Sequence, residues 1–397
     1  MSFSISQDNY SLKVFGSTYK IEEMRSALLK WFEFNGRHSI PWKLKPDGSL
    51  PKKLEQLPVY PIWIAEVMLQ QTQLKVVMPY WENWMRTFPT LIRLSNALEH
   101  DVLLLWQGLG YYSRARRIYK ASNQLLRVLG DADSLDPSSW PTDLETWVGL
   151  PGIGPTTAAS ILSSAFDLPE ALLDGNVKRV LARLIASKKK VSTDSNRLWA
   201  ISNELLDHDS PRNFNQALMD LGAMVCTPKT PKCFCCPLKK YCLAYHKGDV
   251  SKFPVKGSKK VLDSSIIGLG LIINNAGEVL IDQRKDDQTM GGMWEFPGGK
   301  QERGEAIEST IVRELYEELD IEVKVLKKLI EFDHSYTHKK LHFVAFTCKL
   351  ISGQPKPLAS LKIKWVQPEN LVHYPFPAAN QRIINALKEY LVLDIRK

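Results

Sequence analysis

Two carboxylic acids in this chain stand where a carboxyl group could do acid–base chemistry. Glu66 is the single acid in residues 62–69, a run that is otherwise apolar. A helix that is apolar on every side is buried, and a buried carboxyl without partners keeps its proton because its pKa rises. A carboxyl that is protonated at neutral pH can serve as a general acid. Glu66 is therefore a candidate acid, and a buried structural ion pair is the alternative.

The second acid is Asp174, which stands directly before an apolar repeat at Val177, Val180 and Leu184. That spacing predicts a helix with Asp174 as its N-terminal cap. A capping role and a catalytic role are compatible, so both interpretations of Asp174 stay open.

Three glutamines follow the Glu66 run in residues 70–73, among them Gln70 and Gln71. Amides beside an acid suit contacts with base edges and the filling of a vacated base stack. Residues 108–117 add a second polar segment, in which two tyrosines, Tyr111 among them, are followed by three arginines. Such a segment supports stacking and phosphate contact, or else it is an ordinary surface loop.

Gly152 and Gly154 lie in a predicted tight turn that opens a helix. Glycines allow the backbone to approach a phosphate closely, and the first amides of the helix can then bind it. An ordinary connection between two helices is the alternative interpretation.

Five of the six cysteines lie between residues 226 and 242. Four thiolates can hold one tetrahedral metal ion or one cubane cluster. Structural zinc sites usually carry two C-x2-C pairs, and this segment has one, which counts against zinc. Cys235 is expected to be a bystander, and Cys348 to lie in the core. The four predicted ligands, with the spacing C-x6-C-x2-C-x5-C, are Cys226, Cys233, Cys236 and Cys242.

The composition limits where these groups can act. The chain has 397 residues and a net charge of +9, with 52 Lys and Arg against 43 Asp and Glu, which suits a nucleic-acid partner. No apolar run is long enough for a membrane span, and the first twenty residues lack the apolar core of a signal peptide. We therefore expect a cytoplasmic, nucleoid-associated protein in a reducing compartment, where clustered cysteines bind metal rather than form disulfides.

The elements that must position these groups fall into two predicted domains. Residues 20–248 form a mostly helical domain that contains the cysteine loop at 226–242. Residues 249–263 are a basic linker. Residues 264–397 form an α+β domain with a strand at 266–273, a hairpin turn at 275–277 and a strand at 279–281. A helix at 305–319, strands near 343–346 and 362–366, and a last helix at 379–391 complete it.

Together these motifs resemble the MutY family of adenine DNA glycosylases, over residues 21–242 and on into the C-terminal domain. The resemblance implies a multidomain protein: an all-α helix-hairpin-helix glycosylase domain with a [4Fe–4S] loop, followed by an α+β Nudix-like domain. It also implies base-excision repair by a monomer that binds duplex DNA with adenine opposite 8-oxoguanine or guanine.

The resemblance also implies roles for the site residues. Glu66 would protonate adenine N7 and later help to deliver water, and Asp174 would stabilise the oxocarbenium-like sugar, as paired carboxylates do in glycoside hydrolysis. Thr156 and Asn176 match positions that support the sugar and the nucleophile. Relatives that cut the strand carry a lysine where Thr156 stands, so we expect a glycosylase without efficient lyase activity. Gln71 and Tyr111 match residues that insert around 8-oxoguanine.

Two features depart from the family pattern. Residues 44–58 form a longer spacer before Glu66 than is usual, and no function is assigned to it. Lys43 follows Trp42 at a position where relatives vary, so no contact with the flipped base is assigned to Lys43.

The C-terminal domain also resembles Nudix hydrolases, through the run 294–299 and the box around Arg313. Asp320 stands where that box has a glycine that ends the helix in a left-handed turn. Residues 336–338 match a lesion-reading loop, with Thr337 and His338 as predicted contacts of 8-oxoguanine. The box predicts a Mg²⁺ site formed by Glu314, Glu317 and Glu318.

Three alternative functions remain at this stage. The C-terminal domain could hydrolyse oxidised nucleoside triphosphates, an activity that the nearly intact box favours. A pyrimidine glycosylase with lyase activity is opposed by Thr156. A non-catalytic iron–sulfur redox sensor that binds DNA is opposed by Glu66 and Asp174, which a sensor does not need.

Overall fold

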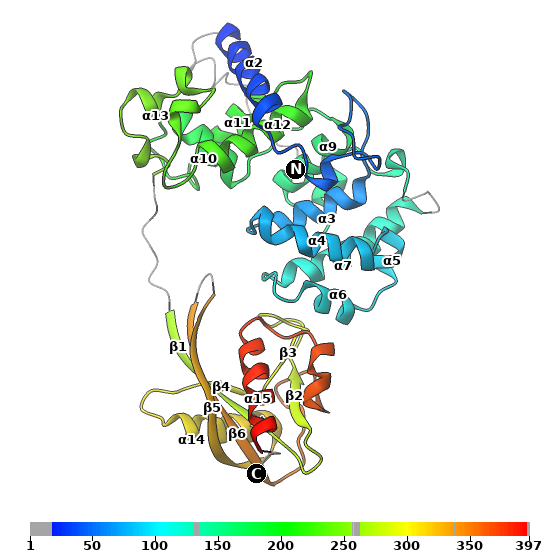
Figure 1. Cartoon of the computed structure of the whole chain (residues 1–397), viewed down its shortest axis with the longest axis vertical. Coiled ribbons are helices and arrows are strands. Elements are labelled where there is room, and N and C mark those ends of the chain that lie inside the picture. Colours follow the sequence, from blue (N-terminus) through cyan, green and yellow to red (C-terminus); the bar gives the residue numbers. More distant parts are fainter. Residues whose placement is uncertain (1–17, 131–134, 256, 258–262, 337–338, 395–397) are drawn as a thin grey trace. The chain divides into compact units, whose positions relative to one another are not determined.

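The computed structural model describes residues 18–130, 135–255, 257, 263–336 and 339–394 (Figure 1). The chain divides into two compact units. The first comprises residues 1–77, 88–95 and 120–259, and the second comprises residues 78–87, 96–119 and 260–397. In the described part of the chain, no helix is both long and apolar enough to cross a membrane.

The described residues from 18 to 252 are mostly helical, as predicted for residues 20–248. Three of the shorter elements matter for the site: η1 (Pro41–Lys43), the π-helical turn η3 (Leu221–Val225) and η4 (Cys233–Cys235). The α-helices are α2 (Thr18–Asn35), α3 (Val59–Leu69), α4 (Leu74–Thr87), α5 (Leu91–Ser95), α6 (Glu99–Trp106), α7 (Ser113–Leu129), α8 (Leu144–Val148), α9 (Pro155–Phe166), α10 (Gly175–Leu184), α11 (Ser195–Leu205), α12 (Pro211–Asp220) and α13 (Leu243–His246). The remaining short turns are η2 (Pro137–Ser139), η5 (Lys239–Tyr241) and η6 (Val250–Lys252).

The core of the first unit joins α2, α10, α11 and α12. Met24 and Leu28 of α2, Leu181 of α10 and Leu218 of α12 are buried in one hydrophobic cluster. The apolar repeats at 21–32 and 177–184 therefore face the core, as their helical spacing predicted. This packing fixes the start of α10, where Asp174 stands.

Helix α3 carries Glu66 and is buried on nearly all sides, as its sequence predicted. Trp63, Ile64 and Ala65 are fully buried, and α3 packs against α9. Because side chains cover the whole circumference of α3, the helix cannot turn its one carboxyl outward to bulk water. Glu66 is accordingly only partly exposed.

The loop of residues 44–58 is held at its second half by side chains from elsewhere in the unit. The carboxylate of Asp167, at the end of α9, accepts the backbone N–H groups of Leu54 and Arg212 at 2.9 and 3.0 Å. The Arg212 guanidinium donates to the carbonyls of Glu55 and Ala165. The first half of the loop forms a turn in which Gly48 has a φ of +80° and faces open space.

The second unit contains two sheets. The strands are β1 (Asp263–Ile272), β2 (Val279–Gln283), β3 (Trp294–Glu295), β4 (Gly298–Lys300), β5 (Glu322–Ser335), β6 (Lys339–Ser352) and β7 (Lys362–Val366). The larger sheet has the order β4-β1-β6-β5 and the smaller β3-β2-β7. Strands β1 and β6 are parallel, and β5 and β6 form an antiparallel hairpin.

Two helices cover opposite faces of the larger sheet. Val344 and Phe346 of β6 pack with α14 (Ile307–Leu319), whereas Phe343 and Ala345 pack with α15 (Asn380–Asp394). This alternation along one strand is the period-2 pattern of a sheet that is buried on both faces. Cys348 is buried, as predicted. The short helix η7 (Pro368–His373) precedes α15.

One predicted connection in this unit is wrong. The turn at residues 275–277 does join β1 to β2, but the two strands lie in different sheets and meet at a single bridge between Ile273 and Val279. The Asn274 side chain accepts the N–H groups of Ala276 and Glu278 and closes the turn. The tight turn was therefore identified correctly, but β1 pairs with distant β6 instead of its neighbour in sequence.

Candidate active site

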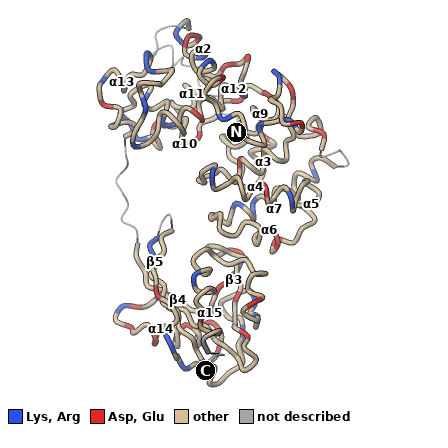
Figure 2. Tube along the Cα trace, in the orientation of Figure 1, with Lys and Arg blue, Asp and Glu red and all other residues tan. Residues whose placement is uncertain are grey.

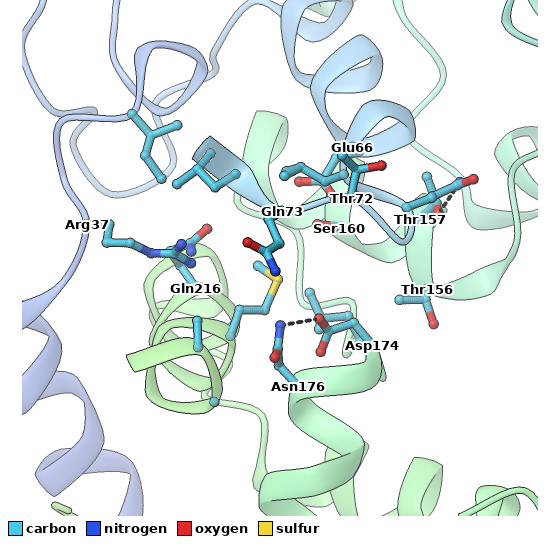
Figure 3. Close-up of a pocket in the computed structure, with 18 of the residues that line it drawn as sticks. Arg37, Glu66, Thr72, Gln73, Thr156, Thr157, Ser160, Asp174, Asn176 and Gln216 are labelled. Carbon is cyan, nitrogen blue, oxygen red and sulfur yellow. Dashed lines mark hydrogen bonds between the residues drawn. The ribbon is translucent and has the colours of Figure 1, made fainter. Parts of the chain in front are cut away.

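Glu66 and Asp174 border the same cavity, of about 710 Å³ (Figure 3). Glu66 comes from the middle of α3 and Asp174 from the start of α10, 108 positions later in the chain. A volume of several hundred Å³ is typical of small-molecule sites. The polar and charged residues that line the cavity are Arg37, Lys43, Glu66, Gln70, Thr72, Gln73, Lys75, Thr156, Thr157, Ser160, Asp174, Asn176, Arg179 and Gln216.

The Glu66 carboxyl holds its proton more strongly than an ordinary glutamate. Burial is the main cause, and nearby Asp174 adds to it, so the pKa of Glu66 rises to about 7. The Ser160 hydroxyl and the Lys43 ammonium oppose this rise because both favour the carboxylate. At neutral pH a substantial fraction of Glu66 is protonated and can donate its proton.

Asp174 caps α10, as its position in the sequence predicted. Its Oδ1 accepts the Val177 N–H at 2.7 Å, and its Oδ2 accepts the Asn176 amide at 3.0 Å. Burial raises the pKa of Asp174, while these two donors and the Arg179 guanidinium lower it. Burial has the largest effect on the pKa of both acids, and three groups that favour the anion surround Asp174.

A chain of hydrogen bonds runs from Asp174 to the cysteine loop. Asn176, which bonds Asp174, accepts a hydrogen bond from Arg179 at 2.8 Å. Arg179 also donates to the carbonyls of Cys226 and Gly222 at 2.8 and 2.7 Å. Cys226 and Asp174 are thus joined through the side chains of Asn176 and Arg179.

The hairpin before α9 is fixed to the cavity wall. Gly152 adopts a φ of +82°, a conformation that favours glycine, and Gly154 caps α9. The Gln70 amide donates to the Gly152 carbonyl and to the Thr157 hydroxyl at 3.2 and 3.1 Å. In this structure the Gln70 amide therefore braces the hairpin, and its predicted contact with DNA stays a prediction.

Thr156 lies on the first turn of α9 and lines the cavity, as the sequence suggested. Its hydroxyl donates to the Leu173 carbonyl at 3.3 Å, next to Asp174. Ser160, which sequence analysis missed, stands one helical turn further on the same side of α9. Its spacing of four from Thr156 was a usable signal, because residues i and i+4 share a helix face.

Gln71 and Tyr111 both project from strained backbone positions. They have φ values of +61° and +50°, which non-glycine residues seldom adopt, and both side chains are exposed. Neither residue lines the cavity. Their predicted insertion around 8-oxoguanine stays a prediction, and their strained, exposed placement agrees with a role in contact with a ligand.

The arginines next to Tyr111 are committed to the fold. Arg114 is buried, lies over the rings of Trp106 and Tyr111, and donates to the Gly110 carbonyl at 3.0 Å. Arg116 is paired with Glu99. Arg114 and Arg116 therefore contact other parts of the protein, and the phosphate contact predicted for residues 108–117 does not come from these two side chains.

Three of the four predicted cluster ligands lie against the helical core. Cys226, Cys236 and Cys242 pack against the hydrophobic cluster of the first unit. The pKa of Cys236 is raised to about 12. Burial is the main cause, and repulsion from the other cysteines of the loop adds to it. Cys235 is exposed, and its thiol donates to the Lys232 carbonyl. Among the residues that the structure describes, no three Cys, His or acidic side chains converge closely enough to hold a single metal ion.

Basic side chains accompany this loop. Figure 2 shows Lys and Arg along the turns around α13, in the segment that contains Lys229, Lys232, Lys239 and Lys240. Such a cluster of positive charge suits contact with a phosphate backbone.

In the C-terminal domain, two of the three predicted Mg²⁺ ligands, Glu314 and Glu317, are paired with an arginine. The Arg313 guanidinium donates to Glu305 at 2.9 Å, to Glu314 at 3.0 Å and to Glu317 at 3.2 Å. Burial, followed by repulsion from Glu314, raises the pKa of Glu318 to about 7. These contacts form an ion-pair network rather than a set of ligands that converge on one ion.

Asp320 and residues 336–338 are the other positions of this domain for which the sequence made a prediction. Asp320 ends α14 with φ and ψ of 57° and 44°, the left-handed conformation that its place in the box predicted. Thr337 and His338 lie outside the described residues. Tyr336, just before them, is half-buried, and its ring centroid lies 4.6 Å from that of His334.

Known proteins resemble both parts of this chain. Residues 64–201 match the family described as HhH-GPD superfamily base excision DNA repair protein, and residues 268–386 match the NUDIX domain. The adenine DNA glycosylase of Buchnera aphidicola subsp. Schizaphis graminum is 31% identical over 366 residues, 91% of this chain and 97% of that protein. The human adenine DNA glycosylase is 29% identical over 412 residues, 90% of this chain and 73% of that protein. A solved thermostable thymine-DNA glycosylase, at 22% identity, aligns with 58% of this chain and 98% of its own with a TM-score of 0.49.

Proposed function

The chain belongs to the adenine DNA glycosylase family, and on that basis we propose that it removes adenine paired with 8-oxoguanine or guanine and leaves the DNA strand uncut. The predicted combination of a helical glycosylase domain with a Nudix-like domain is confirmed. The observation that carries the mechanism is the placement of two carboxyls in one cavity, where the pKa of Glu66 is raised to about 7 and the Asp174 carboxylate accepts two hydrogen bonds.

In this mechanism Glu66 is the acid. Adenine enters the cavity after it leaves the base stack, and Glu66 transfers its proton to adenine N7. The bond between C1′ of the sugar and N9 of adenine then breaks, and its electron pair leaves with the base. Protonation matters because it makes adenine a neutral leaving group instead of an anion.

Asp174 stabilises the sugar that is left behind. Loss of adenine gives C1′ the positive charge of an oxocarbenium ion, and the Asp174 carboxylate supplies the opposite charge. Asn176 and the Val177 N–H hold that carboxylate in place. Water then adds to C1′ and gives its proton to Glu66, which regenerates the acid and leaves an abasic site.

Strand cutting requires a further group that the hairpin does not offer. A lyase forms a Schiff base between a lysine amine and C1′, and Thr156 stands at the corresponding position with a hydroxyl. This supports a glycosylase without efficient lyase activity.

A duplex assay with enzyme in excess tests the proposal. Adenine opposite 8-oxoguanine should be released, and the labelled strand should break only after hot alkali. A pyrimidine glycosylase with lyase activity would cut the strand without alkali, and a redox sensor would release no base. Either result would contradict the proposal.

We also propose that the cysteine loop holds a [4Fe–4S] cluster through Cys226, Cys233, Cys236 and Cys242. Four thiolates are the usual ligand set of such a cluster, and three of these cysteines pack against the hydrophobic core of the first unit. Arg183 is buried and donates to the Cys226 sulfur at 3.3 Å, so it offers a positive charge beside a thiolate. When bound, the cluster would supply a rigid cross-link that orders the basic loop for contact with the phosphates of the DNA backbone.

The metal content can be measured directly. Protein purified without oxygen should be yellow-brown and contain about four iron atoms per chain. Cys236→Ser should lose most of this iron, because Cys236 is a proposed ligand, whereas the matched Cys235→Ser should keep it. Stoichiometric zinc without iron would contradict the proposed cluster.

Lesion reading is proposed for the loop that contains Thr337 and His338. 8-Oxoguanine differs from guanine at N7, which becomes a donor, and at the new O8. One neutral hydrogen bond contributes about 0.5–1.5 kcal/mol, so Thr337→Ala should narrow the affinity ratio between A:8-oxoguanine and A:G duplexes by several-fold. The measurement uses duplexes with an uncleavable adenine analogue.

The control for this prediction is Ser335→Ala, which removes a hydroxyl two residues away. An unchanged affinity ratio in folded Thr337→Ala, or an equal change in Ser335→Ala, would remove Thr337 from lesion recognition.

A nucleotide-hydrolase activity of the C-terminal domain is less well supported. Arg313 pairs with three acids of the box, which favours a structural role for the network over Mg²⁺ binding. We therefore assign this domain to recognition of the DNA substrate.

A further inference from the structure

The turn of residues 107–112 presents Tyr111, and its backbone enters the left-handed region three times. Gly108, Gly110 and Tyr111 have φ values of +95°, +77° and +50°. Glycine adopts such values without steric cost, whereas tyrosine does not, and a backbone of this kind keeps its shape only where surrounding groups hold it. The groups that hold this turn therefore determine where the exposed ring of Tyr111 lies.

Two tyrosine hydroxyls fix the first peptide group of the turn. The Tyr80 hydroxyl of α4 donates to the Gln107 carbonyl at 3.1 Å. The hydroxyl of the buried Tyr112 accepts the Gly108 N–H at 3.3 Å. Because the carbonyl and the N–H belong to the same peptide group, both of its polar atoms are bonded. The backbone from which the Gln107 side chain extends is therefore well defined.

The Gln107 side chain connects the turn to the C-terminal domain, which belongs to the same compact unit as residues 96–119. Its Oε1 accepts the backbone N–H of Phe376 at 3.4 Å, a long hydrogen bond. The Phe376 side chain is fully buried in the core of the C-terminal domain, and the Pro375 carbonyl accepts the Trp294 N–H at 2.8 Å. The partner of Gln107 is thus a fixed part of that domain.

Side chains on both sides of the turn make further contacts with the C-terminal domain. Before the turn, His100 of α6 donates from Nε2 to the His373 carbonyl at 2.8 Å, and its ring meets the Tyr374 ring edge-on, with centroids 6.0 Å apart. After the turn, the Arg116 guanidinium pairs with the Asp286 carboxylate at 2.8 Å. Contacts with one domain therefore flank the turn.

We propose that Gln107 is a positioning residue for lesion recognition, through which the C-terminal domain holds Tyr111 beside the base opposite adenine. The inference rests on the proposed function and on the predicted insertion of Tyr111 around 8-oxoguanine. It gives the C-terminal domain a second means of selecting the lesion. Besides the contacts proposed for its own residues 337–338, it holds in place a side chain of the helical segment.

The experiment measures the affinity ratio between A:8-oxoguanine and A:G duplexes, each with an uncleavable adenine analogue, in wild type, Gln107→Met and Gln107→Glu. Methionine keeps the length of the side chain but offers no oxygen to the Phe376 N–H. The ratio should therefore fall by about two- to tenfold, the usual effect of one hydrogen bond. Glutamate keeps an acceptor oxygen and should retain the wild-type ratio.

The matched control is Gln367→Met. The Gln367 amide also bonds a backbone group of the second unit, the Ala276 carbonyl in the turn before β2. The same exchange is thus made at a glutamine that does not contact the Tyr111 turn, and it should leave the affinity ratio unchanged.

A double variant separates positioning from an independent effect. Tyr111→Ala alone should narrow the affinity ratio. Adding Gln107→Met to Tyr111→Ala should narrow it no further, because a residue that acts through Tyr111 then has nothing left to position. Losses that add in the double variant overturn the inference, and so does an equal loss in Gln107→Met and Gln107→Glu.

The remaining outcomes separate this inference from the proposals on which it rests. A lower melting temperature of Gln107→Met with an unchanged affinity ratio denotes a purely structural contact and overturns the inference alone. If Tyr111→Ala leaves the ratio unchanged, the predicted insertion of Tyr111 fails, and the role of Gln107 fails with it. Release of adenine by the wild-type protein, measured on the same duplex with natural adenine, tests the proposed function separately.

Discussion

Replacing Glu66 with Gln is expected to slow adenine excision by about 10²–10⁴-fold, the contribution that general acids usually make. Glutamine keeps the shape of the side chain but has no proton to donate to adenine. Binding of the mispaired duplex should survive, because the change leaves the cavity and the charged loop around the cysteines intact. The rate is measured in single-turnover assays with enzyme in excess, and binding with an uncleavable adenine analogue.

Stability separates loss of chemistry from loss of fold in this variant. The pKa of Glu66 is raised to about 7 in the folded chain, so the folded state holds the proton more strongly than the unfolded state. The stability associated with this proton is present at low pH and is lost as the pH rises from the unfolded value to about 7. Glutamine does not titrate, so at pH 8 the variant should be at least as stable as wild type.

Glu170→Gln is the matched control, since burial also raises the pKa of Glu170 and Glu170 does not line the cavity. It should excise adenine at close to the wild-type rate. Excision by Glu66→Gln within tenfold of wild type would exclude Glu66 as the acid.

Replacing Asp174 with Asn should slow excision by roughly 10²–10³-fold, the usual cost of losing one charge-stabilising group at a transition state. The asparagine oxygen can still accept the Val177 N–H, so the cap of α10 is kept. What is lost is the negative charge opposite C1′. The same assays measure this effect, and the melting temperature reports on the cap.

The control for Asp174 is Asp143→Asn. Asp143 caps α8 and accepts the Thr146 N–H at 2.7 Å, so the same exchange is made at another helix start that does not line the cavity. If both variants lose excision equally, or if Asp174→Asn retains nearly full excision, Asp174 acts only as a cap.

The sequence predicted Glu66 and Asp174 because each stands out in its local pattern. A lone acid in an apolar helix and an acid before an apolar repeat are both visible without knowledge of the fold. The cavity joins residues separated by more than a hundred positions, and their proximity depends on how α3, α9 and α10 pack. Local spacing contains no information about that packing.

Arg179 and Arg183 show where sequence patterns fail. Both lie on an amphipathic helix among charged residues and would ordinarily be placed on the surface. Instead Arg183 is 2% exposed and donates to the Thr227 and Phe253 carbonyls, while Arg179 donates to the Cys226 carbonyl. Backbone carbonyls are present at every residue, so an arginine that binds them leaves no signature in the sequence.

The prediction of the strands and their order was incomplete for a related reason. Strand β5 went unpredicted because its outward side chains are charged and its register with β6 contains irregularities, which obscure the alternation of a regular strand. Strands β1 and β2 are neighbours in sequence, yet β1 pairs with β6. A turn motif predicts that the chain reverses, but tertiary packing decides which strand becomes the partner.

The loop of residues 44–58 has a consequence for how this chain can vary. Asp167 and Arg212 hold its second half, so the entry into α3 does not depend on the turn around Gly48. Gly48 faces open space, and extra residues there would extend outward into solvent. Insertions and deletions during evolution can therefore accumulate at this turn, and a reporter peptide can be placed there, while Glu66 keeps its position in the cavity.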